Sequence, residues 1–184
     1  YGFCLPNKGF NELIKAVKIM SDKNIYLELN LFTAIYDDCF TYVYHELVDL
    51  VDKLNIREIV NINTEYMTDE QTVKNLSSQD LIVFPYQNTN ESSSASVRQA
   101  LMALKPTLVT PNPIFNDISD CIEYLPGFTS DEIADGISNW IKRSKNKKES
   151  EILQYKKQKF INNFKFSRMG SRLLNMIYSL EINQ

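Results

Sequence analysis

The sequence predicts an α/β protein with a Rossmann-like parallel sheet and helices on both faces. Apolar segments of strand length alternate with amphipathic helical segments along the whole 184-residue chain, which is the pattern of a parallel sheet covered by helices. The strand segments, such as Leu81–Tyr86, are almost continuously apolar, as expected for strands that are buried on both faces. Ligands of such sheets bind at the carboxyl ends of the strands. We therefore expect the functional site at that edge.

The individual elements follow from local patterns. The opening segment, Tyr1–Cys4, reads as the end of a first strand. In the first helix, apolar residues recur at i, i+3 and i+4 from Phe10 to Met20, and Ser130 is the expected N-cap of a later helix. The predicted strands are Tyr26–Phe32, Ile56–Ile62, Leu81–Tyr86, Thr107–Thr110 and Cys121–Leu125, and the predicted helices are Phe10–Met20, Tyr42–Leu54, Thr68–Leu76, Ser94–Leu104, Ser130–Arg143 and Ser167–Leu180.

Composition narrows the class of protein. The length fits a single domain spanning residues 1–184, and 43% hydrophobic residues are normal for a globular protein. A formal charge of −3 argues against a dedicated nucleic-acid binder. The sequence shows neither a bilayer-spanning apolar run nor a signal peptide, so we expect a cytoplasmic protein. Because the chain opens on a strand end without an initiator Met, we expect a fragment of a longer polypeptide.

Cysteine and histidine usage favours no metal site. Cys4, Cys39 and Cys121 are far apart, and buried free thiols in a reducing compartment are the expected state. His45 is the only histidine, and zinc would require more ligands than these residues supply. We expect His45 to lie at the surface or in packing, without a catalytic role.

The most informative segment joins a strand to a serine-rich helix start. The apolar run Leu81–Tyr86 leads through a polar loop to Glu91, and a helix is predicted to begin at Ser94. The free N–H groups and the dipole of a helix N-terminus attract anions. A carboxylate beside them suits a ligand that also carries hydroxyl groups, as a nucleotide sugar does. The segment therefore predicts a nucleotide-sugar site.

Two motifs resemble a known family. The opening Gly2-Phe-Cys-Leu-Pro-Asn-Lys-Gly9 is similar to the start of the C-terminal, donor-binding domain of retaining GT-B glycosyltransferases of the group 1 type. In that family a strand ending in proline precedes two glutamates that are separated by seven intervening residues. Here Pro85 and Glu91 match the strand end and the first glutamate, whereas Gln99 stands at the second. Ala100-Leu-Met-Ala-Leu-Lys-Pro106 matches the family's next block, and the likeness covers roughly residues 1–143.

The resemblance implies a role for each matching residue. Glu91 would be the catalytic-site carboxylate that holds hydroxyls of the donor sugar. Lys8 would pair with the donor diphosphate, and Gln99 would face the ribose. The donor-binding residues implied are Lys8, Gly9, Ser93, Ser94, Ala95, Arg98 and Gln99, of which Ser93–Ala95 would cradle the distal phosphate through their backbone. The implied activity is hexosyl transfer from a nucleotide-diphosphate sugar, without a cofactor or metal.

The chain departs from the family pattern at two positions. Phe3 replaces an arginine that often accompanies the lysine, and Arg98 is the candidate to compensate for the missing charge. Gln99 accepts hydrogen bonds through one carbonyl only and brings no negative charge, which predicts weaker donor binding. A non-catalytic nucleotide- or glycan-binding module of the same fold is therefore the alternative function.

A receiver-like signalling domain is a further alternative. Asp37-Asp38 and Lys105-Pro106 are reminiscent of its acidic residues and its Lys-Pro pair. Their order along the strands is wrong, because Asp37-Asp38 follows the second strand and Lys105 precedes a strand. Pro85 also stands where the phospho-acceptor would be needed.

The resemblance also implies partners. GT-B enzymes bind donor and acceptor between two domains. The expected partners are therefore a glycan or lipid-linked acceptor and an N-terminal acceptor domain, which is expected to be missing here. The fragment alone would then be inactive, and the family suggests bacterial polysaccharide biosynthesis. The lysine-rich stretch Lys142–Lys159 is expected to be a solvated helix face or a peripheral contact with an anionic membrane. The C-terminal helices of residues 144–184 are expected to pack Met169, Leu173, Leu174 and Ile177 inward.

Overall fold

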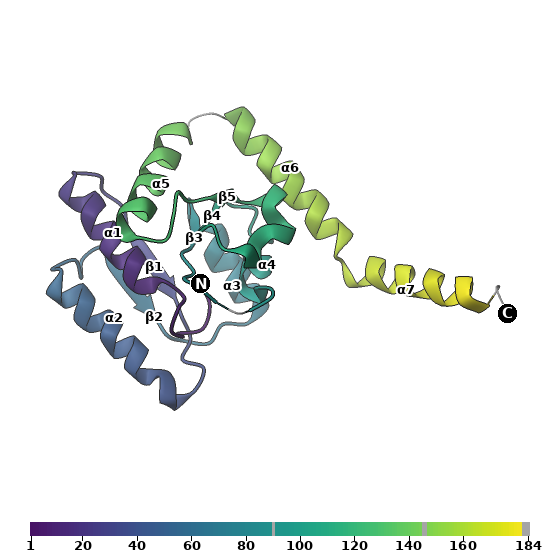
Figure 1. Cartoon of the computed structure of the whole chain (residues 1–184), viewed down its shortest axis with the longest axis horizontal. Helices are drawn as coiled ribbons and strands as arrows, with labels where there is room; N and C mark the ends of the chain where they lie inside the picture. The colour runs from purple at the N-terminus through teal and green to yellow at the C-terminus, as the bar shows by residue number, and fades with distance from the viewer. Residues whose placement is uncertain (90, 145–146, 182–184) are drawn as a thin grey trace.

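The computed structural model describes residues 1–89, 91–144 and 147–181. Its strands pair in parallel throughout, which confirms the predicted α/β class. They form two sheets instead of one (Figure 1). The first sheet contains β1 (Leu29–Phe32) and β2 (Val60–Asn63), and the second contains β3 (Ile82–Phe84), β4 (Thr107–Val109) and β5 (Glu123–Tyr124).

The prediction of a strand at Tyr1–Cys4 is wrong, although this segment lies beside the end of β1. The N–H groups of Gly2 and Cys4 donate to the carbonyls of Phe32 and Ala34, at 3.0 and 2.8 Å, where β1 ends. The described residues form no ladder between β1 and β3. An open groove of about 1020 Å³ remains there, with apolar side chains in its lining that include Leu13, Val17, Leu29, Val83, Ile137 and Trp140.

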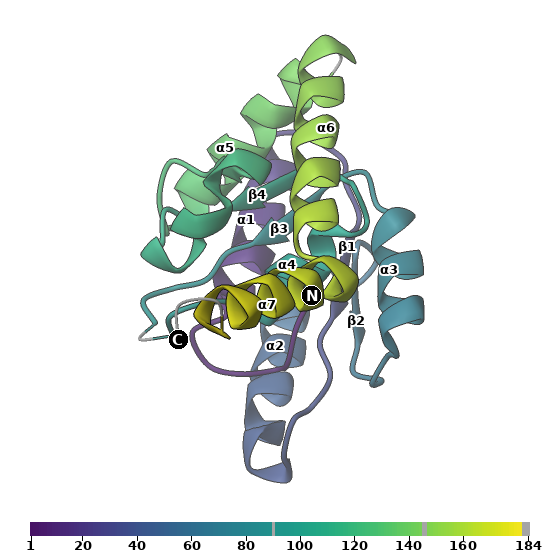
Figure 2. The same cartoon turned by 90° about the vertical axis from the view of Figure 1, so that its right-hand side faces the viewer.

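The helices cover both faces of the strands, as predicted. On one face α1 (Phe10–Asp22), α2 (Thr41–Lys53) and α5 (Ser130–Arg143) share a core with β1 and β2. On the other, α3 (Asp69–Ser77), α4 (Ala95–Leu101) and the 3-10 segment η2 (Pro113–Cys121) enclose a second core with β3 and β4. Figure 2 shows the strands lying between α5 and α3. Because helices pack on both faces of the strands, the carboxyl ends of the strands are the expected place for a ligand of this fold.

The N-cap of α5 and the end of α4 differ from the sequence prediction. The N-cap of α5 is Thr129 and not Ser130, because a capping box joins the Thr129 hydroxyl to the Glu132 N–H and the Glu132 carboxylate to the Thr129 N–H. Ser130 has an isoleucine three residues later and lacks that partner. The helix at Ser94 ends at Leu101, because the chain enters a left-handed conformation at Leu104 with φ of 56°.

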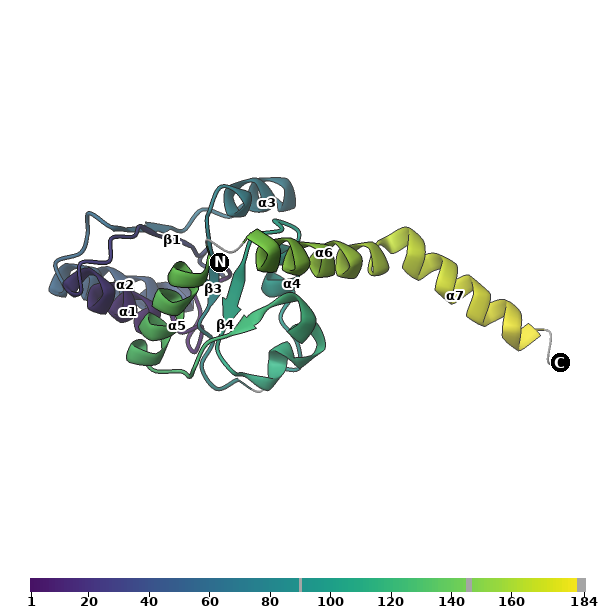
Figure 3. The same ribbon diagram turned by 90° about the horizontal axis from the view of Figure 1, so that it is seen from above.

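The prediction that the apolar residues of the last helix pack inward is wrong. The helix α6 (Lys147–Asn163) packs against η2, whereas α7 (Phe166–Glu181) points away from the strands (Figure 3). Its apolar residues Met169, Leu173, Leu174 and Ile177 are 43–59% exposed. They do not pack inward because no other described element lies beneath α7.

The lysine-rich stretch is not uniformly solvated. Lys157 on α6 is fully buried, and its ammonium donates to the Lys105 carbonyl and to the Thr107 hydroxyl. Burial lowers the pKa of Lys157 to about 8. The prediction of a solvated face is therefore wrong at this position, where the lysine attaches α6 to the start of β4.

Three smaller expectations have definite outcomes. Cys4 and Cys121 are buried free thiols as predicted, but Cys39 is exposed because it lies in a short 3-10 helix, η1 (Asp38–Phe40). His45 lies at the surface of α2. Among the described residues, no helix combines the length and apolarity needed to cross a membrane.

Candidate functional site

A tight turn positions Lys8 beside the loop that follows β3. Gly9 has φ of 74°, and a Cβ atom there would lie 1.7 Å from the Pro85 carbonyl oxygen. The Gln87 N–H donates to the Asn7 carbonyl at 2.9 Å. Only glycine permits this backbone conformation together with so close an approach. The turn before α1 and the loop after β3 therefore form one unit.

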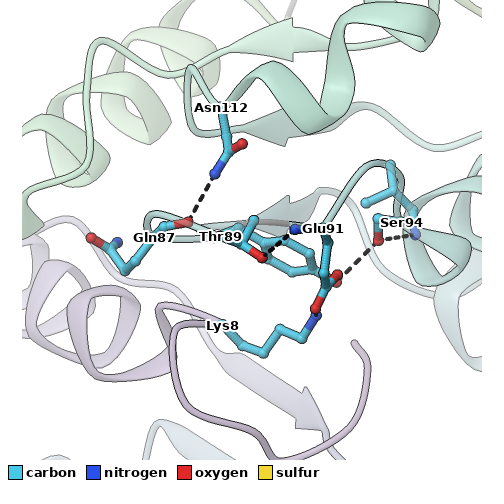
Figure 4. Close-up of polar contacts among 8 residues, drawn as sticks. Lys8, Gln87, Thr89, Glu91, Ser94 and Asn112 are labelled. Carbon is cyan, nitrogen blue, oxygen red and sulfur yellow. Dashed lines mark hydrogen bonds and ion pairs between the residues drawn. The ribbon is translucent and has the colours of Figure 1, made fainter.

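Lys8 and Glu91, predicted to share this edge, are in contact. The Lys8 Nζ lies 3.4 Å from the Glu91 Oε1 and 4.1 Å from the centroid of the Tyr86 ring (Figure 4). The Lys8 side chain is 12% exposed and that of Glu91 is 49% exposed. The cation is mostly covered by the Tyr86 ring, but its ionic partner Glu91 is half exposed and can give way to another anion. A second anion can reach it without a large rearrangement.

Ser94 has a structural role in its side chain. Its hydroxyl accepts from the Val97 N–H as the N-cap of α4 and is bonded to the Tyr86 hydroxyl at 3.2 Å. Ser94 is buried, whereas Ser93 and Ala95 are exposed. The Ser94 hydroxyl is therefore already engaged by protein groups, and the backbone role that the resemblance implies for Ser93–Ala95 stays a prediction.

Sequence reasoning missed the side chains that hold the loop after β3. The Asn112 amide donates to the Gln87 carbonyl at 2.8 Å (Figure 4). The Gln87 amide donates to the Pro85 and Phe128 carbonyls. The Thr110 hydroxyl donates to the Tyr86 carbonyl. The available signal was a pair of polar residues, Thr110 and Asn112, directly after the β4 strand. These bonds fix the backbone from which Glu91 projects.

A small aromatic pocket lies next to this unit. It has a volume of about 50 Å³ and is lined by Tyr1, Gly2, Phe3, Phe32, Ala34, Glu65, Tyr66, Met67 and Ser96. Phe3 packs edge-on against Tyr36, with ring centroids 5.1 Å apart. An aromatic side chain therefore stands where the family often has an arginine, and it offers a ligand a flat apolar surface.

The two remaining predicted residues are engaged by protein groups. Gln99 accepts from the Tyr1 hydroxyl at 2.5 Å and donates to the Asp69 Oδ1 at 2.7 Å. Arg98 donates to the Ser94 carbonyl and forms an ion pair with Asp117. The guanidinium of Arg98 is thus neutralised by its own neighbour, and its availability to a phosphate is reduced.

The arrangement suits binding of an anion that also carries hydroxyl groups. One cation, one exposed carboxylate and the backbone at the start of α4 converge at the carboxyl ends of the strands, and the aromatic pocket adjoins them. The described residues contain no group of His, Cys, Asp and Glu side chains that could hold a metal ion. The site offers charge and hydrogen bonds, as phosphate recognition requires.

Comparison with known sequences gives no assignment. No protein-family model matches the chain, and no curated protein matches it significantly in sequence.

Comparison of structures is informative. The chain superposes on a glycosyltransferase from Rickettsia africae with a TM-score of 0.80 at 14% identity, covering 99% of this chain and 47% of that one. It superposes on HepE from Anabaena, solved with UDP, with a TM-score of 0.77 at 15% identity, covering 97% and 48%.

A single domain superposes over most of its own length. This is the C-terminal domain of a group 1 glycosyl transferase from Francisella tularensis, with a TM-score of 0.69 at 13% identity, covering 89% of this chain and 83% of that one. Our chain spans only about half the length of the two longer proteins. It therefore has the Rossmann-like fold of one half of a GT-B glycosyltransferase.

Proposed function

We propose that this chain is the donor-binding half of a glycosyltransferase and that it binds a nucleotide-diphosphate sugar. Lys8 neutralises the diphosphate, the backbone of Ser93–Ala95 donates to the distal phosphate, and Glu91 accepts hydrogen bonds from the sugar hydroxyls. The flat aromatic surface at the small pocket beside Gly2 contacts the base of the nucleoside. In the complete enzyme a second domain supplies the acceptor, which is a glycan or a lipid-linked sugar.

The observation that carries this proposal is the Lys8–Glu91 pair on the face of Tyr86. The two residues are 83 positions apart in the sequence and meet at the end of β3. A lysine and a carboxylate here are the two groups that a diphosphate with an attached sugar needs. The fold likeness to a protein solved with UDP supports the same ligand class.

In this proposal, transfer would require the second domain. Much of the rate of a transferase comes from holding donor and acceptor in a reactive orientation, and the residues that would orient the acceptor are not in the described site. We therefore expect nucleotide binding by this chain and no sugar transfer. The expected chemistry is retaining hexosyl transfer without a metal.

A thermal-shift panel with UDP, GDP, ADP and their sugar conjugates tests the binding step. A nucleotide at about 100 times its dissociation constant should stabilise the folded chain by roughly 2.7 kcal/mol. Stabilisation by one nucleotide family and a further gain from its sugar conjugate would support the proposal. No stabilisation by any of them, up to millimolar concentration, would contradict it.

Phe3 and Gln99 favour a second candidate, a nucleotide- or glycan-binding module without catalysis. One phosphate partner is absent at Phe3, and the Gln99 amide is already bonded to Tyr1 and Asp69. The two functions differ in the effect of a second domain. Adding the acceptor domain should restore transfer for an enzyme half and should leave a binding module inactive.

A further inference from the structure

The side chains of Tyr1, Gln99 and Asp69 form a short hydrogen-bonded chain between α3 and α4. The Tyr1 hydroxyl donates to the Gln99 Oε1 at 2.5 Å, and the Gln99 Nε2 donates to the Asp69 Oδ1 at 2.7 Å. These three residues come from the segment before α1 and from two helices. The contacts place a carboxylate directly beside residue 99.

The chemistry of the partners fixes the orientation of the Gln99 amide. A carboxylate can only accept hydrogen bonds, so the amide nitrogen must face Asp69 and the amide oxygen must face Tyr1. Burial raises the pKa of the Tyr1 phenol, and the charge of Asp69 acts in the same direction. The phenol thus remains a donor at neutral pH, which suits the Gln99 oxygen.

In this orientation the group that can accept hydrogen bonds from a ligand is the Asp69 carboxylate and not the Gln99 amide. The Gln99 oxygen already accepts from Tyr1, and its nitrogen points to Asp69. Asp69 is exposed and stands in the first turn of α3, where the helix dipole favours its negative charge. Its contact with Gln99 uses Oδ1 and leaves Oδ2 to accept from a ligand.

The hydrogen-bonded chain borders the aromatic pocket. The Tyr1 ring lines that pocket, and so do Met67, two residues before Asp69, and Ser96, one turn before Gln99. Two hydrogen bonds, from Tyr1 to Gln99 and from Gln99 to Asp69, lead from the pocket wall to the Asp69 carboxylate, which is not itself a lining residue. A nucleoside whose base contacts Tyr1 would turn its ribose toward Asp69. A carboxylate in this position can accept hydrogen bonds from the two neighbouring hydroxyls of a ribose.

We propose that Asp69 accepts hydrogen bonds from the ribose hydroxyls of the bound nucleotide, and that Gln99 is a positioning residue that holds Asp69 in place. This assignment rests on the proposed function, because it requires a nucleotide in the pocket. It makes the chain selective for ribonucleotides through a residue outside the two motifs that resemble the family. Under this assignment Gln99→Glu would weaken nucleotide binding, since a second carboxylate would repel Asp69 and could not donate a hydrogen bond to it.

Isothermal titration of UDP, GDP and ADP, each against its 2′,3′-dideoxy counterpart, tests the assignment. The wild-type chain should bind the preferred ribonucleotide about tenfold more tightly than the dideoxy form, which is about 1.4 kcal/mol. Asp69→Asn should reduce that preference to about twofold or less. The matched control is Glu70→Gln, which removes a charge from the same helical turn and should keep the tenfold preference.

A double-mutant cycle tests the role of Gln99. Gln99→Leu should lower the preference for ribonucleotides severalfold while Asp69 is present, and it should have no further effect on the Asp69→Asn chain. Thermal midpoints of all variants establish that they are folded. A merely structural role would weaken binding of both nucleotide forms equally, and that result would overturn the positioning role.

The outcomes separate this inference from the proposed function. Nucleotide binding with an undiminished ribose preference in Asp69→Asn would overturn the inference and leave the proposed function intact. Equal binding of ribo and dideoxy forms by the wild-type chain would do the same. Failure of the wild-type chain to bind any nucleotide would overturn both.

Discussion

Lys8 and Lys157 are both withdrawn from solvent and both donate to oxygen atoms, but their surroundings differ. Lys8 lies in the turn before α1, where its partner is the half-exposed Glu91. Lys157 is fully buried, and its partners are the Lys105 carbonyl and the Thr107 hydroxyl. A ligand can replace an exposed carboxylate but cannot reach oxygens in the interior. The comparison fits the proposed role of Lys8 in ligand binding, whereas Lys157 attaches α6 to the start of β4.

The position of Lys8 depends on Gly9, and this gives the largest expected effect. Gly9→Ala should lower the free energy of unfolding by about 3 kcal/mol or more, because the new Cβ would clash with the Pro85 carbonyl and the positive φ would be strained. Chemical denaturation followed by circular dichroism measures the change. Gly170→Ala is the control, because nothing lies within 4 Å of its Cβ position. It should stabilise the exposed helix by about 0.5–1 kcal/mol. Equal losses in both variants would contradict the steric explanation.

Lys157 predicts a pH dependence of stability. Its pKa is lowered from 10.5 to about 8 in the folded chain. Below pH 8 Lys157 is charged in both the folded and the unfolded chain, and the burial of that charge destabilises the folded chain. Between about pH 8 and 10.5 only the unfolded chain stays protonated, so the free energy of unfolding should rise with pH, by up to about 3 kcal/mol.

The measurement is denaturation at several pH values for the wild-type and Lys157→Met chains. Methionine keeps most of the buried stem without a charge, so the rise should be absent or much smaller in that variant. The difference between the two chains cancels the titration of other groups in this range. Parallel pH profiles would show that Lys157 does not carry the effect.

Lys8→Ala should weaken the binding of a nucleoside diphosphate by about 1.5–3 kcal/mol, the usual contribution of a hydrogen bond to a charged group. Lys157→Met should leave that affinity unchanged, because its side chain lies in the interior beside β4. Isothermal titration compares the two variants with the wild type. A loss of affinity in Lys157→Met as large as that in Lys8→Ala would remove the functional distinction between these lysines.

Glu91 gives the smallest expected effect on the bare nucleotide. Glu91→Gln should tighten diphosphate binding by at most about 1 kcal/mol, because an exposed ion pair with Lys8 is weak and competes with the ligand. The same variant should weaken the nucleotide sugar relative to the nucleotide, since the amide accepts fewer hydrogen bonds from sugar hydroxyls. Titration of both ligands checks this opposition. The same loss for both ligands would give Glu91 a structural role.

Periodicity and chain order were enough to predict the class of fold and the edge of the sheet at which Lys8 and Glu91 lie. Apolar strands alternating with amphipathic helices imply parallel strands with helices on both faces, and the carboxyl ends of those strands converge. Lys8 and Glu91 were placed together on this argument, and their side chains are 3.4 Å apart. Such inferences succeed because they depend on periodicity and chain order, which are local properties of the sequence.

The folded structure was needed to show which polar side chains are already hydrogen-bonded to other protein groups. Asp69 is unremarkable in the sequence as an acidic residue at a helix start, yet its carboxylate meets the Gln99 amide at 2.7 Å. Lys157 is one lysine among many in its stretch, yet its side chain is fully buried. The apolar residues of α7 recur with a helical period, yet they stay exposed because no described element packs against that face. Partner choice depends on distances between segments that are remote in the chain, and no local pattern encodes those distances.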